Sequence, residues 1–256
     1  MPRVSGKVAL ISGGAQGLGA AQARLLVQEG AKVVLGDILD DEGAALAAEL
    51  GESVRYVHLD VTELAHWEAA VTTAVTDFGG LDILVNNAGI VNFGAIADYP
   101  VEAWNTIIAV NLTGVFLGIK AATPEITKSG AGSIINISST AGLQGYEALP
   151  GYTAAKFGVR GLTKAVALDL ARYNVRVNSV HPGAIRTPMT GGLDLPQNHV
   201  ALHRIGEPIE VANLVLFLAS DESSFSTGAE FVADGGETAG LSHYTDHTPW
   251  SGSSTA

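Results

Sequence analysis

The sequence predicts an α/β fold: a doubly wound domain with a seven-stranded, mostly parallel sheet and helices on both faces. Short apolar runs alternate with helix-length segments along the chain, and this alternation is typical of a parallel sheet covered on both faces. A glycine-rich turn joins the first apolar run to the first helical segment. No linker, repeat or block of charge divides the 256 residues, so we predict one domain over residues 1–241 and a polar tail at 242–256.

The first strand and the first helix are predicted from Val8–Ile11 and from the segment 20–27. A short continuous apolar run is typical of a strand buried on both faces. Segment 20–27 is rich in helix formers, and Gly30 marks the end of the helix. The later strands are expected at 32–36, 54–58, 83–85, 133–137, 175–180 and 230–233, with a turn at 234–236 after the last one. The later helices are expected at about 41–50, 64–78, 101–128, 152–172 and 208–220.

Composition argues against several classes of function. The formal net charge of −12 argues against binding to nucleic acid or to an anionic membrane as a main role. The absence of cysteine excludes disulfides and thiolate metal sites, and it fits a reducing compartment. The chain opens without a charged-then-apolar leader and has no run of about 18 uninterrupted apolar residues. We therefore expect a cytoplasmic protein without a membrane-spanning segment.

The turn from Ser12 to Gly19 predicts an anion site. Its glycines Gly13, Gly17 and Gly19 follow the pattern Gly-x-x-x-Gly-x-Gly. Because glycine has no Cβ, it permits positive φ and a close approach of the backbone to a pyrophosphate. The unpaired N–H groups at the start of the following helix would face the same anion. A dinucleotide is therefore the expected ligand.

Asp37 ends the second predicted strand and bears on which dinucleotide binds. A carboxylate at this point suits the 2′-hydroxyl of the adenosine ribose and repels a 2′-phosphate. No basic residue follows at 38–41, and Gln16 occupies a turn position where a basic side chain could have met a phosphate. Asp37 could instead be a loop carboxylate that caps the next helix. We interpret the pattern as a preference for NAD(H) over NADP(H).

Tyr152 and Lys156 are the candidate proton-transfer pair. Residues four apart lie on one face of a helix, so the ammonium can lie beside the phenol. A neighbouring positive charge favours the phenolate, and we expect it to lower the pKa of the tyrosine from about 10. A tyrosine tuned in this way can move a proton to or from an alcohol oxygen near neutral pH. Taken alone, the pair could equally be a helix start with a surface lysine.

Together these features resemble the short-chain dehydrogenase/reductase family, which has a Rossmann-type fold, and the resemblance extends from about Gly6 to Gly236. The family's glycine motif matches the glycine turn, with Ser12 where threonine is more usual. One matching motif could be accidental, but several occur here in the family's order. They are Asn86-Asn87-Ala88-Gly89, Val110-Asn111-Leu112, Ser138-Ser139, Tyr152 with Lys156, and Pro182-Gly183 with Ile185 and Thr187.

The resemblance implies four catalytic residues: Asn111, Ser139, Tyr152 and Lys156. The Ser139 hydroxyl, at the end of the fifth strand, can hydrogen-bond a substrate carbonyl or alcohol. Tyr152 would be the general base in alcohol oxidation and the general acid in ketone reduction, while Lys156 would also bind the nicotinamide ribose. Asn111 would hold a water that links Lys156 to solvent. The plainer alternatives are a serine that merely ends a strand and a helix asparagine that bonds to nearby backbone.

The resemblance also implies the cofactor contacts. Asp60 matches the family's adenine-binding position, although it could equally be a helix N-cap. No metal is expected, since His181 is a lone histidine without companion ligands. The residues expected to bind NAD are Gly13, Gln16, Gly17, Leu18, Gly19, Asp37, Asp60, Val61, Asn87, Ala88, Gly89, Tyr152, Lys156, Pro182, Gly183, Ile185 and Thr187.

The substrate is expected to be a hydrophobic alcohol or ketone. In the family, the substrate pocket is lined by the segment after the catalytic serine and by a loop that corresponds here to about 187–205. Small ligands bind in largely apolar pockets with few polar anchors, although apolar residues in these segments could instead only pack the loop. The pocket candidates are Ser139, Leu143, Tyr146 and Met189. Further resemblance to bacterial 3α(20β)-hydroxysteroid dehydrogenases lies at 37–40, 55–62, 158–162 and 179–183.

We therefore predict an NAD(H)-dependent oxidoreductase that interconverts a secondary alcohol and a ketone, with a hydroxysteroid as substrate. The alternative enzyme is a broad NAD-dependent alcohol dehydrogenase or ketoreductase for bulky non-steroidal substrates. A β-ketoacyl carrier reductase is disfavoured by Asp37 and by the lack of a basic docking patch. A non-catalytic NAD-sensing protein is a further alternative on the same fold, and the intact Ser139, Tyr152 and Lys156 speak against it.

The assembly expected is a homotetramer. The helices predicted at 101–128 and 152–172 carry apolar residues around much of their circumference, so they need cover on more than one side. Packing within the monomer could supply this cover. The family commonly assembles through these helices, which favours a symmetric tetramer.

Overall fold

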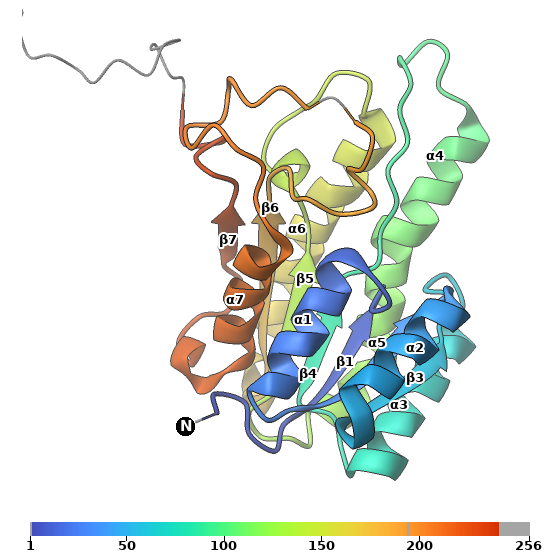
Figure 1. Cartoon of the computed structure of the whole chain (residues 1–256), viewed down its shortest axis with the longest axis vertical. Coiled ribbons are helices and arrows are strands. Elements are labelled where there is room, and N and C mark those ends of the chain that lie inside the picture. The colour runs from blue at the N-terminus through green and yellow to red at the C-terminus, as the bar shows by residue number, and fades with distance from the viewer. Residues whose placement is uncertain (1, 194, 241–256) are drawn as a thin grey trace, which may run out of the picture.

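The fold is built on a seven-stranded sheet (Figure 1). The computed structural model describes residues 2–193 and 195–240, so the tail predicted at 242–256 lies outside the described residues. The strands are β1 (Val8–Ser12), β2 (Lys32–Asp37), β3 (Val54–His58), β4 (Ile83–Asn86), β5 (Ser133–Ile137), β6 (Arg176–Pro182) and β7 (Glu230–Ala233). Their order is β3-β2-β1-β4-β5-β6-β7, and every neighbouring pair is parallel. The predicted fold class is therefore confirmed.

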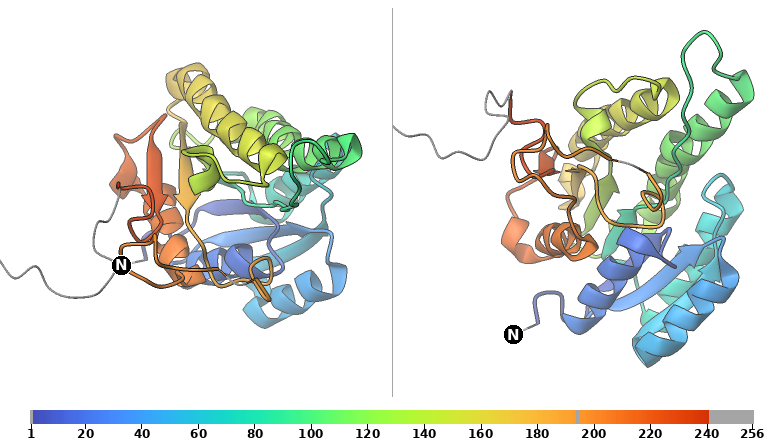
Figure 2. Two further views of the ribbon diagram at one scale, coloured as in Figure 1. Left: turned by 90° about the horizontal axis from the view of Figure 1, so that it is seen from above. Right: turned by 45° about the horizontal axis from the view of Figure 1, so that its top comes forward.

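Helices cover both faces of the sheet, as Figure 2 shows. One face carries α1 (Gly17–Gln28), α2 (Asp40–Leu50) and α7 (Pro208–Ala219). The other face carries α3 (Leu64–Phe78), α5 (Gly114–Ile126) and α6 (Pro150–Leu170), with α4 (Val101–Ile108) leading into α5. The sheet is thus the middle one of three layers.

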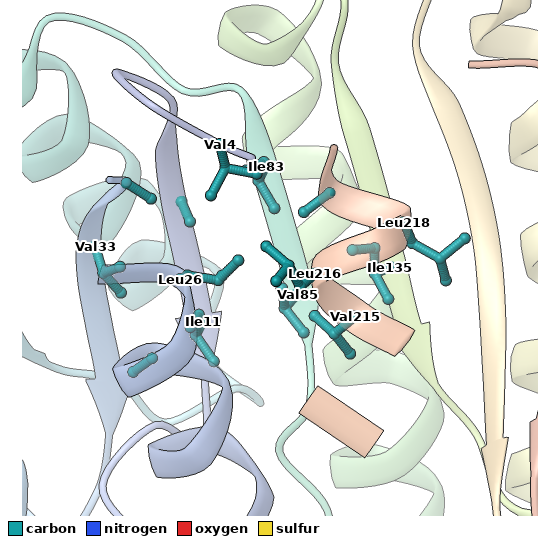
Figure 3. Packing of buried hydrophobic residues seen from close by; sticks show 14 of the residues in the cluster. Val4, Ile11, Leu26, Val33, Ile83, Val85, Ile135, Val215, Leu216 and Leu218 are labelled. Carbon is teal, nitrogen blue, oxygen red and sulfur yellow. The ribbon is translucent and has the colours of Figure 1, made fainter. Parts of the chain in front are cut away.

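Neighbouring residues of a central strand enter different cores, because successive side chains of a strand point to opposite faces. Ile11 of β1 belongs to the cluster that contains Leu26 of α1 and Val215 of α7 (Figure 3). Leu10 belongs to the cluster on the other face, with Trp67 of α3. All five of these apolar side chains are almost fully inaccessible to solvent. This double burial explains why β1 is continuously apolar.

The helix predicted at 101–128 contains a change of pitch that the sequence did not indicate. Between α4 and α5 the backbone makes a π-helical turn at Ala109–Thr113, and this turn includes Asn111. Such turns are frequent at functional sites. The stretch Val101–Ile126 is long and apolar enough to cross a membrane, with a mean hydropathy of 1.5, but the core helix of a soluble protein has the same properties. Here Val115, Ile119 and Ile126 lie in the core beside α3.

A chain of buried polar side chains fixes α6 against the ends of two strands. The Asn86 amide donates to Asn136 Oδ1 at 2.8 Å, and the Asn136 amide donates to Thr163 Oγ1 at 2.9 Å. The Thr163 hydroxyl in turn donates to the Val159 carbonyl at 2.8 Å. Asn136 and Thr163 are both buried. The chain therefore sets the position of α6 relative to β4 and β5.

We predict that Thr163→Val lowers the free energy of unfolding by about 1–3 kcal/mol, because it leaves the buried Asn136 amide without its acceptor. Thr72→Val is the matched control. Thr72 makes the same bond to the residue four positions earlier, Oγ1 to the Glu68 carbonyl at 2.8 Å, but it is exposed and accepts no amide. Urea unfolding of both variants measures the difference. Equal losses in the two variants would contradict the role given to the buried chain.

Candidate active site

The candidate site lies at the carboxyl ends of the central strands, which point to the top of Figure 1. Open parallel sheets bind ligands at this edge, where the strand order reverses, and here the reversal lies between β1 and β4. A cavity of about 130 Å³ occupies this place. Predicted site residues that line it are Leu18, Asn87, Gly89, Ser139, Tyr152, Lys156, Pro182, Gly183, Ile185, Thr187 and Met189. Predicted residues outside this lining are Gly13, Gln16, Gly17, Gly19, Asp37, Asp60, Val61, Ala88, Asn111, Leu143 and Tyr146.

The spaced glycines of the turn are needed for different reasons. A Cβ on Gly13, which has φ of +63°, would lie 2.8 Å from the Cα of Ala88. A Cβ on Gly19 would lie 2.0 Å from the Gly13 carbonyl oxygen. Gly17 opens α1 with φ of +56°, in the left-handed region that side chains disfavour. The turn is therefore pressed tightly between β1, α1 and the segment after β4.

Ser12 ties this turn to the segment after β4. Its hydroxyl accepts hydrogen bonds from the backbone N–H groups of Asn87, at 3.1 Å, and Ala88, at 3.2 Å. The Asn87 amide donates in return to the carbonyls of Ser12 and Gly13, both at 3.0 Å. Serine in place of the more usual threonine thus keeps the hydroxyl contact.

Asp37 is buried at the end of β2 and holds the backbone around the glycine turn. One carboxylate oxygen accepts from the Ala15 N–H at 2.9 Å, and the other accepts from Ile38 and Leu39 at 2.8 and 3.1 Å. Because α2 begins at Asp40 and its N-cap is Leu39, the alternative in which Asp37 caps this helix is wrong. The carboxylate remains near the end of β2, where a ribose would be bound.

Asp60 closes a local turn after β3. Its Oδ1 accepts from the backbone N–H of Thr62 at 2.9 Å and from the Thr62 hydroxyl at 2.7 Å. These hydrogen bonds from Thr62 lower the pKa of the Asp60 carboxyl. The N-cap of α3 is Glu63, so the helix-cap alternative for Asp60 is also wrong. Val61 is buried, and a Cβ on Gly114 would lie 2.9 Å from its Cγ2.

These residues fit a dinucleotide. The crowded turn leaves no space for a Cβ at Gly13 or Gly19, and the N-terminus of α1 follows it directly. Such backbone is typical of a pyrophosphate site. The buried Asp37 carboxylate at one end and the cavity with Lys156 at the other would accommodate the two nucleoside ends.

Tyr152 and Lys156 lie together on α6, as their spacing predicts. The Lys156 Nζ is 5.5 Å from the centroid of the Tyr152 ring and donates to the Ile137 carbonyl at 2.9 Å. Burial of this side chain lowers the pKa of Lys156 to about 8. Burial also raises the pKa of the Tyr152 phenol, and a hydrogen bond with Ser139 acts in the opposite direction. The expected lowering of the tyrosine pKa is therefore wrong for the protein alone, because burial outweighs the favourable contact.

Ser139 is positioned by a histidine to which the sequence analysis gave no role. His181 Nδ1 lies 2.9 Å from the Ser139 carbonyl oxygen, and its Nε2 lies 2.9 Å from the Ser179 hydroxyl. A carbonyl only accepts, so Nδ1 carries the proton and Nε2 accepts from Ser179. Burial lowers the pKa of His181, which keeps the ring neutral. The two-residue spacing of Ser179 and His181 on β6 was the available signal, because it puts both side chains on one face.

Asn111 is fully buried in the π-helical turn. Its Oδ1 accepts from the Ile90 N–H at 2.9 Å, and its Nδ2 donates to the Ile90 carbonyl at 2.8 Å. A Cβ on Gly89 would lie 3.3 Å from Asn111 Oδ1 and 3.7 Å from Lys156 Nζ. The amide thus fixes the segment after β4 beside Lys156.

The predicted substrate segments meet a carboxylate that the sequence analysis missed. The Tyr146 hydroxyl lies within hydrogen-bond distance of two acceptors. They are Thr140 Oγ1, at 2.7 Å, and the carboxylate of Glu237. Burial, together with the hydrogen bond to Glu237, raises the pKa of Tyr146 to about 12. Leu143 is half-buried and lies three residues before Tyr146 in the sequence. Met189 is 43% exposed and lines the cavity. Nothing in the spacing of Glu237 indicated this contact, because 91 residues separate it from Tyr146.

Most of the chain is similar in sequence to one protein family and to several known dehydrogenases. Residues 13–238 match the family described as Enoyl-(Acyl carrier protein) reductase. The chain is 62% identical over 241 residues to a 3-alpha-(or 20-beta)-hydroxysteroid dehydrogenase of Mycobacterium tuberculosis, covering 94% of this chain and 93% of that protein. It is 54% identical over 247 residues to a trans-4-hydroxycyclohexanecarboxylate dehydrogenase of Sinomonas cyclohexanicum, covering 93% and 95%.

A solved structure has the same fold. It is the crystal structure of a short-chain type dehydrogenase/reductase from Mycobacterium marinum, which matches with a TM-score of 0.88 at 36% identity. The match covers 93% of this chain and 97% of that chain.

We predict that Lys156 makes stability depend on alkaline pH. Burial lowers its pKa from 10.5 to about 8, so between these values the unfolded chain holds the proton and the folded chain releases it. Stability therefore rises with pH across this window. Relative to Lys156→Met, the wild type should gain about 1–3 kcal/mol in unfolding free energy from pH 8 to 10.5. The exposed Lys120→Met should show no such pH-dependent difference, and parallel pH profiles for wild type and Lys156→Met would contradict the prediction.

Proposed function

Because the chain belongs to the short-chain dehydrogenase/reductase family and is an oxidoreductase of CH–OH groups, we propose that it interconverts a hydroxysteroid and the corresponding ketone with NAD(H). The observation that carries this proposal is the meeting of Ser139, Tyr152 and Lys156 in one cavity at the strand ends. The relative from Mycobacterium tuberculosis, at 62% identity, supports a hydroxysteroid of the 3α or 20β type.

Tyr152 moves the proton in the proposed reaction. In the direction of oxidation, its deprotonated phenol accepts the proton of the substrate hydroxyl, and in reduction the phenol returns it to the carbonyl oxygen. Ser139 donates a hydrogen bond to that oxygen, and His181 holds the backbone of Ser139 in place. A bound nicotinamide supplies the hydride acceptor or donor for the carbinol carbon. The Lys156 ammonium lies near the phenol and favours the phenolate form of Tyr152. Burial opposes this effect, so the phenolate forms when other positive charge also reaches the site.

NAD(H) is the proposed form of the nicotinamide cofactor. The family uses NAD or NADP, and the buried Asp37 carboxylate at the end of β2 supports NAD because it would repel a 2′-phosphate. The glycine turn and the N-terminus of α1 would hold the pyrophosphate. Asp60 with Val61, and Pro182 with the 183–187 segment, would hold the adenine and the nicotinamide.

A specific observation favours the second candidate, a dehydrogenase of smaller cyclic alcohols. A relative from Comamonas testosteroni, 46% identical over 249 residues and covering 93% of this chain, is named a cyclopentanol dehydrogenase, after a small uncharged cyclic alcohol.

A cytoplasmic homotetramer is the proposed state of the protein. Apolar side chains on α5 and α6 are exposed in the monomer, with Phe116 at 47%, Phe157 at 40% and Leu168 at 82%. Burial of such side chains between copies is favourable, and closed symmetry is the usual outcome. Size-exclusion chromatography with light scattering measures this state.

We predict that Tyr152→Phe reduces kcat by about 10²–10⁴-fold, because it removes the group that transfers the proton. Binding of NADH, followed by fluorescence titration, should persist, since the glycine turn is unchanged. Tyr173→Phe removes an exposed phenol near the end of α6 and serves as the control. Full oxidoreductase activity in Tyr152→Phe would refute the proposed mechanism.

We predict efficient reduction of NAD⁺, and little of NADP⁺, with a 3α-hydroxysteroid as the alcohol. The reason is charge repulsion between Asp37 and the 2′-phosphate of NADP⁺. We expect kcat/KM to be roughly 100-fold higher with NAD⁺ than with NADP⁺. Initial rates are compared with those for a bulky aryl alcohol. Rapid aryl alcohol oxidation without steroid turnover would replace the proposed hydroxysteroid dehydrogenase with a broad alcohol dehydrogenase. The proposed mechanism would remain intact.

A further inference from the structure

Glu237 is a buried carboxylate that the proposed mechanism does not use. It follows β7 and the turn at 234–236, and its side chain is only 5% exposed. Its Oε1 accepts a hydrogen bond from the Tyr146 hydroxyl and lies 3.6 Å from His199 Nε2. Three segments that are far apart in the chain therefore meet at this carboxylate.

The carboxylate lies directly against the wall of the active-site cavity. A Cβ on Gly183 would be 3.0 Å from Glu237 Oε2, and Gly183 lines the cavity together with Ser139 and Tyr152. The other carboxylate oxygen of Glu237, Oε1, hydrogen-bonds the Tyr146 hydroxyl. The same hydroxyl hydrogen-bonds Thr140, the residue after Ser139. Glu237 is thus outside the cavity lining itself: it lies behind Gly183 and is connected through Tyr146 to the segment after the catalytic serine.

Among the residues that the structure describes, no lysine or arginine forms an ion pair with this carboxylate. Within residues 2–193 and 195–240, the ion-pair partner recorded for Glu237 is the histidine of the 187–205 loop, His199. The arginine of the same loop, Arg204, pairs with Glu210 instead. Lys156 points its ammonium to the Ile137 carbonyl. Tyr146 stays a neutral donor at neutral pH, since its pKa is raised to about 12.

We propose that Glu237 is a specificity-determining residue that makes the pocket select uncharged alcohols and ketones and reject substrates bearing a carboxylate. The inference rests on the proposed function of this site as an alcohol oxidoreductase. A buried like charge that is poorly screened opposes a substrate anion, and at an effective permittivity of ~20 the effect is on the order of tenfold to thirtyfold in binding. An uncharged hydroxyl or carbonyl carries no such cost.

The test compares two substrates that share one carbinol and differ in charge. They are trans-4-hydroxycyclohexanecarboxylate and its carboxamide, oxidised with NAD⁺ by the full-length protein. The wild type should prefer the carboxamide by about tenfold or more in kcat/KM. If only steroids are accepted, the pair becomes a 3α-hydroxysteroid with a side-chain carboxylate and its carboxamide.

The variant Glu237→Gln should reduce this preference by about tenfold, mainly through a lower KM for the carboxylate substrate. Glu68→Gln makes the same change of charge on the exposed face of α3 and should leave the preference unchanged. Tyr146→Phe removes the hydrogen-bond donor but keeps the carboxylate, so it should still prefer the carboxamide. It tests the charge even where Glu237→Gln fails to fold.

Each failure is distinguishable. Equal kcat/KM for the two substrates in the wild type would overturn the role of Glu237 and leave the proposed oxidoreductase standing. An unchanged preference in a Glu237→Gln protein that still oxidises the carboxamide would do the same. If the wild type oxidises no alcohol with either nicotinamide cofactor, the proposed function fails, and this inference fails with it.

Discussion

The contact between β1 and the segment after β4 is the constraint on which the site depends. These neighbouring strands lead to helices on opposite faces of the sheet, so a cleft opens at their ends. The Ser12 hydroxyl and the Asn87 amide bridge the cleft with hydrogen bonds in both directions. The close approach leaves no space for a side chain at Gly13 or Gly19. Both the turn that would hold the pyrophosphate and the wall beside Lys156 follow from this contact.

The reactive end of the site is assembled from polar groups buried in an otherwise apolar sheet. Lys156 donates to the end of β5, Asn111 pairs with the backbone of Ile90, and His181 holds the backbone of Ser139. Each group has a partner, which is what makes its burial tolerable. The same burial raises the pKa of the Tyr152 phenol and lowers that of Lys156. Without ligands, the Tyr152 phenol is therefore held away from the phenolate form that proton abstraction needs, while a pKa of about 8 still leaves Lys156 mostly protonated at neutral pH.

Much of the fold could be predicted because its signals are local. The apolar run at Val8–Ile11 is continuous because Leu10 and Ile11 both enter a core, and β1 was predicted to within one residue. The end of β6 was missed by two residues, because Pro182 is in the strand only through pairing with Ala233 of β7. The π-helical turn was missed since its apolar pattern remains helical. For Asp37 and Asp60, local patterns left a helix-cap alternative that the observed helix starts remove.

The sequence by itself determined the succession of strands and helices along the chain, the glycine turn, and the pairing of Tyr152 with Lys156 on one helix face. These depend on spacing within one element or between elements that follow one another, and such spacing is visible in the chain. Tertiary structure alone decided the direction of the tyrosine pKa shift, the support of Ser139 by His181 and the meeting of Glu237 with Tyr146. These depend on burial and on contacts across 42 and 91 residues. The parallel sheet creates such contacts by bringing the ends of distant strands to one edge.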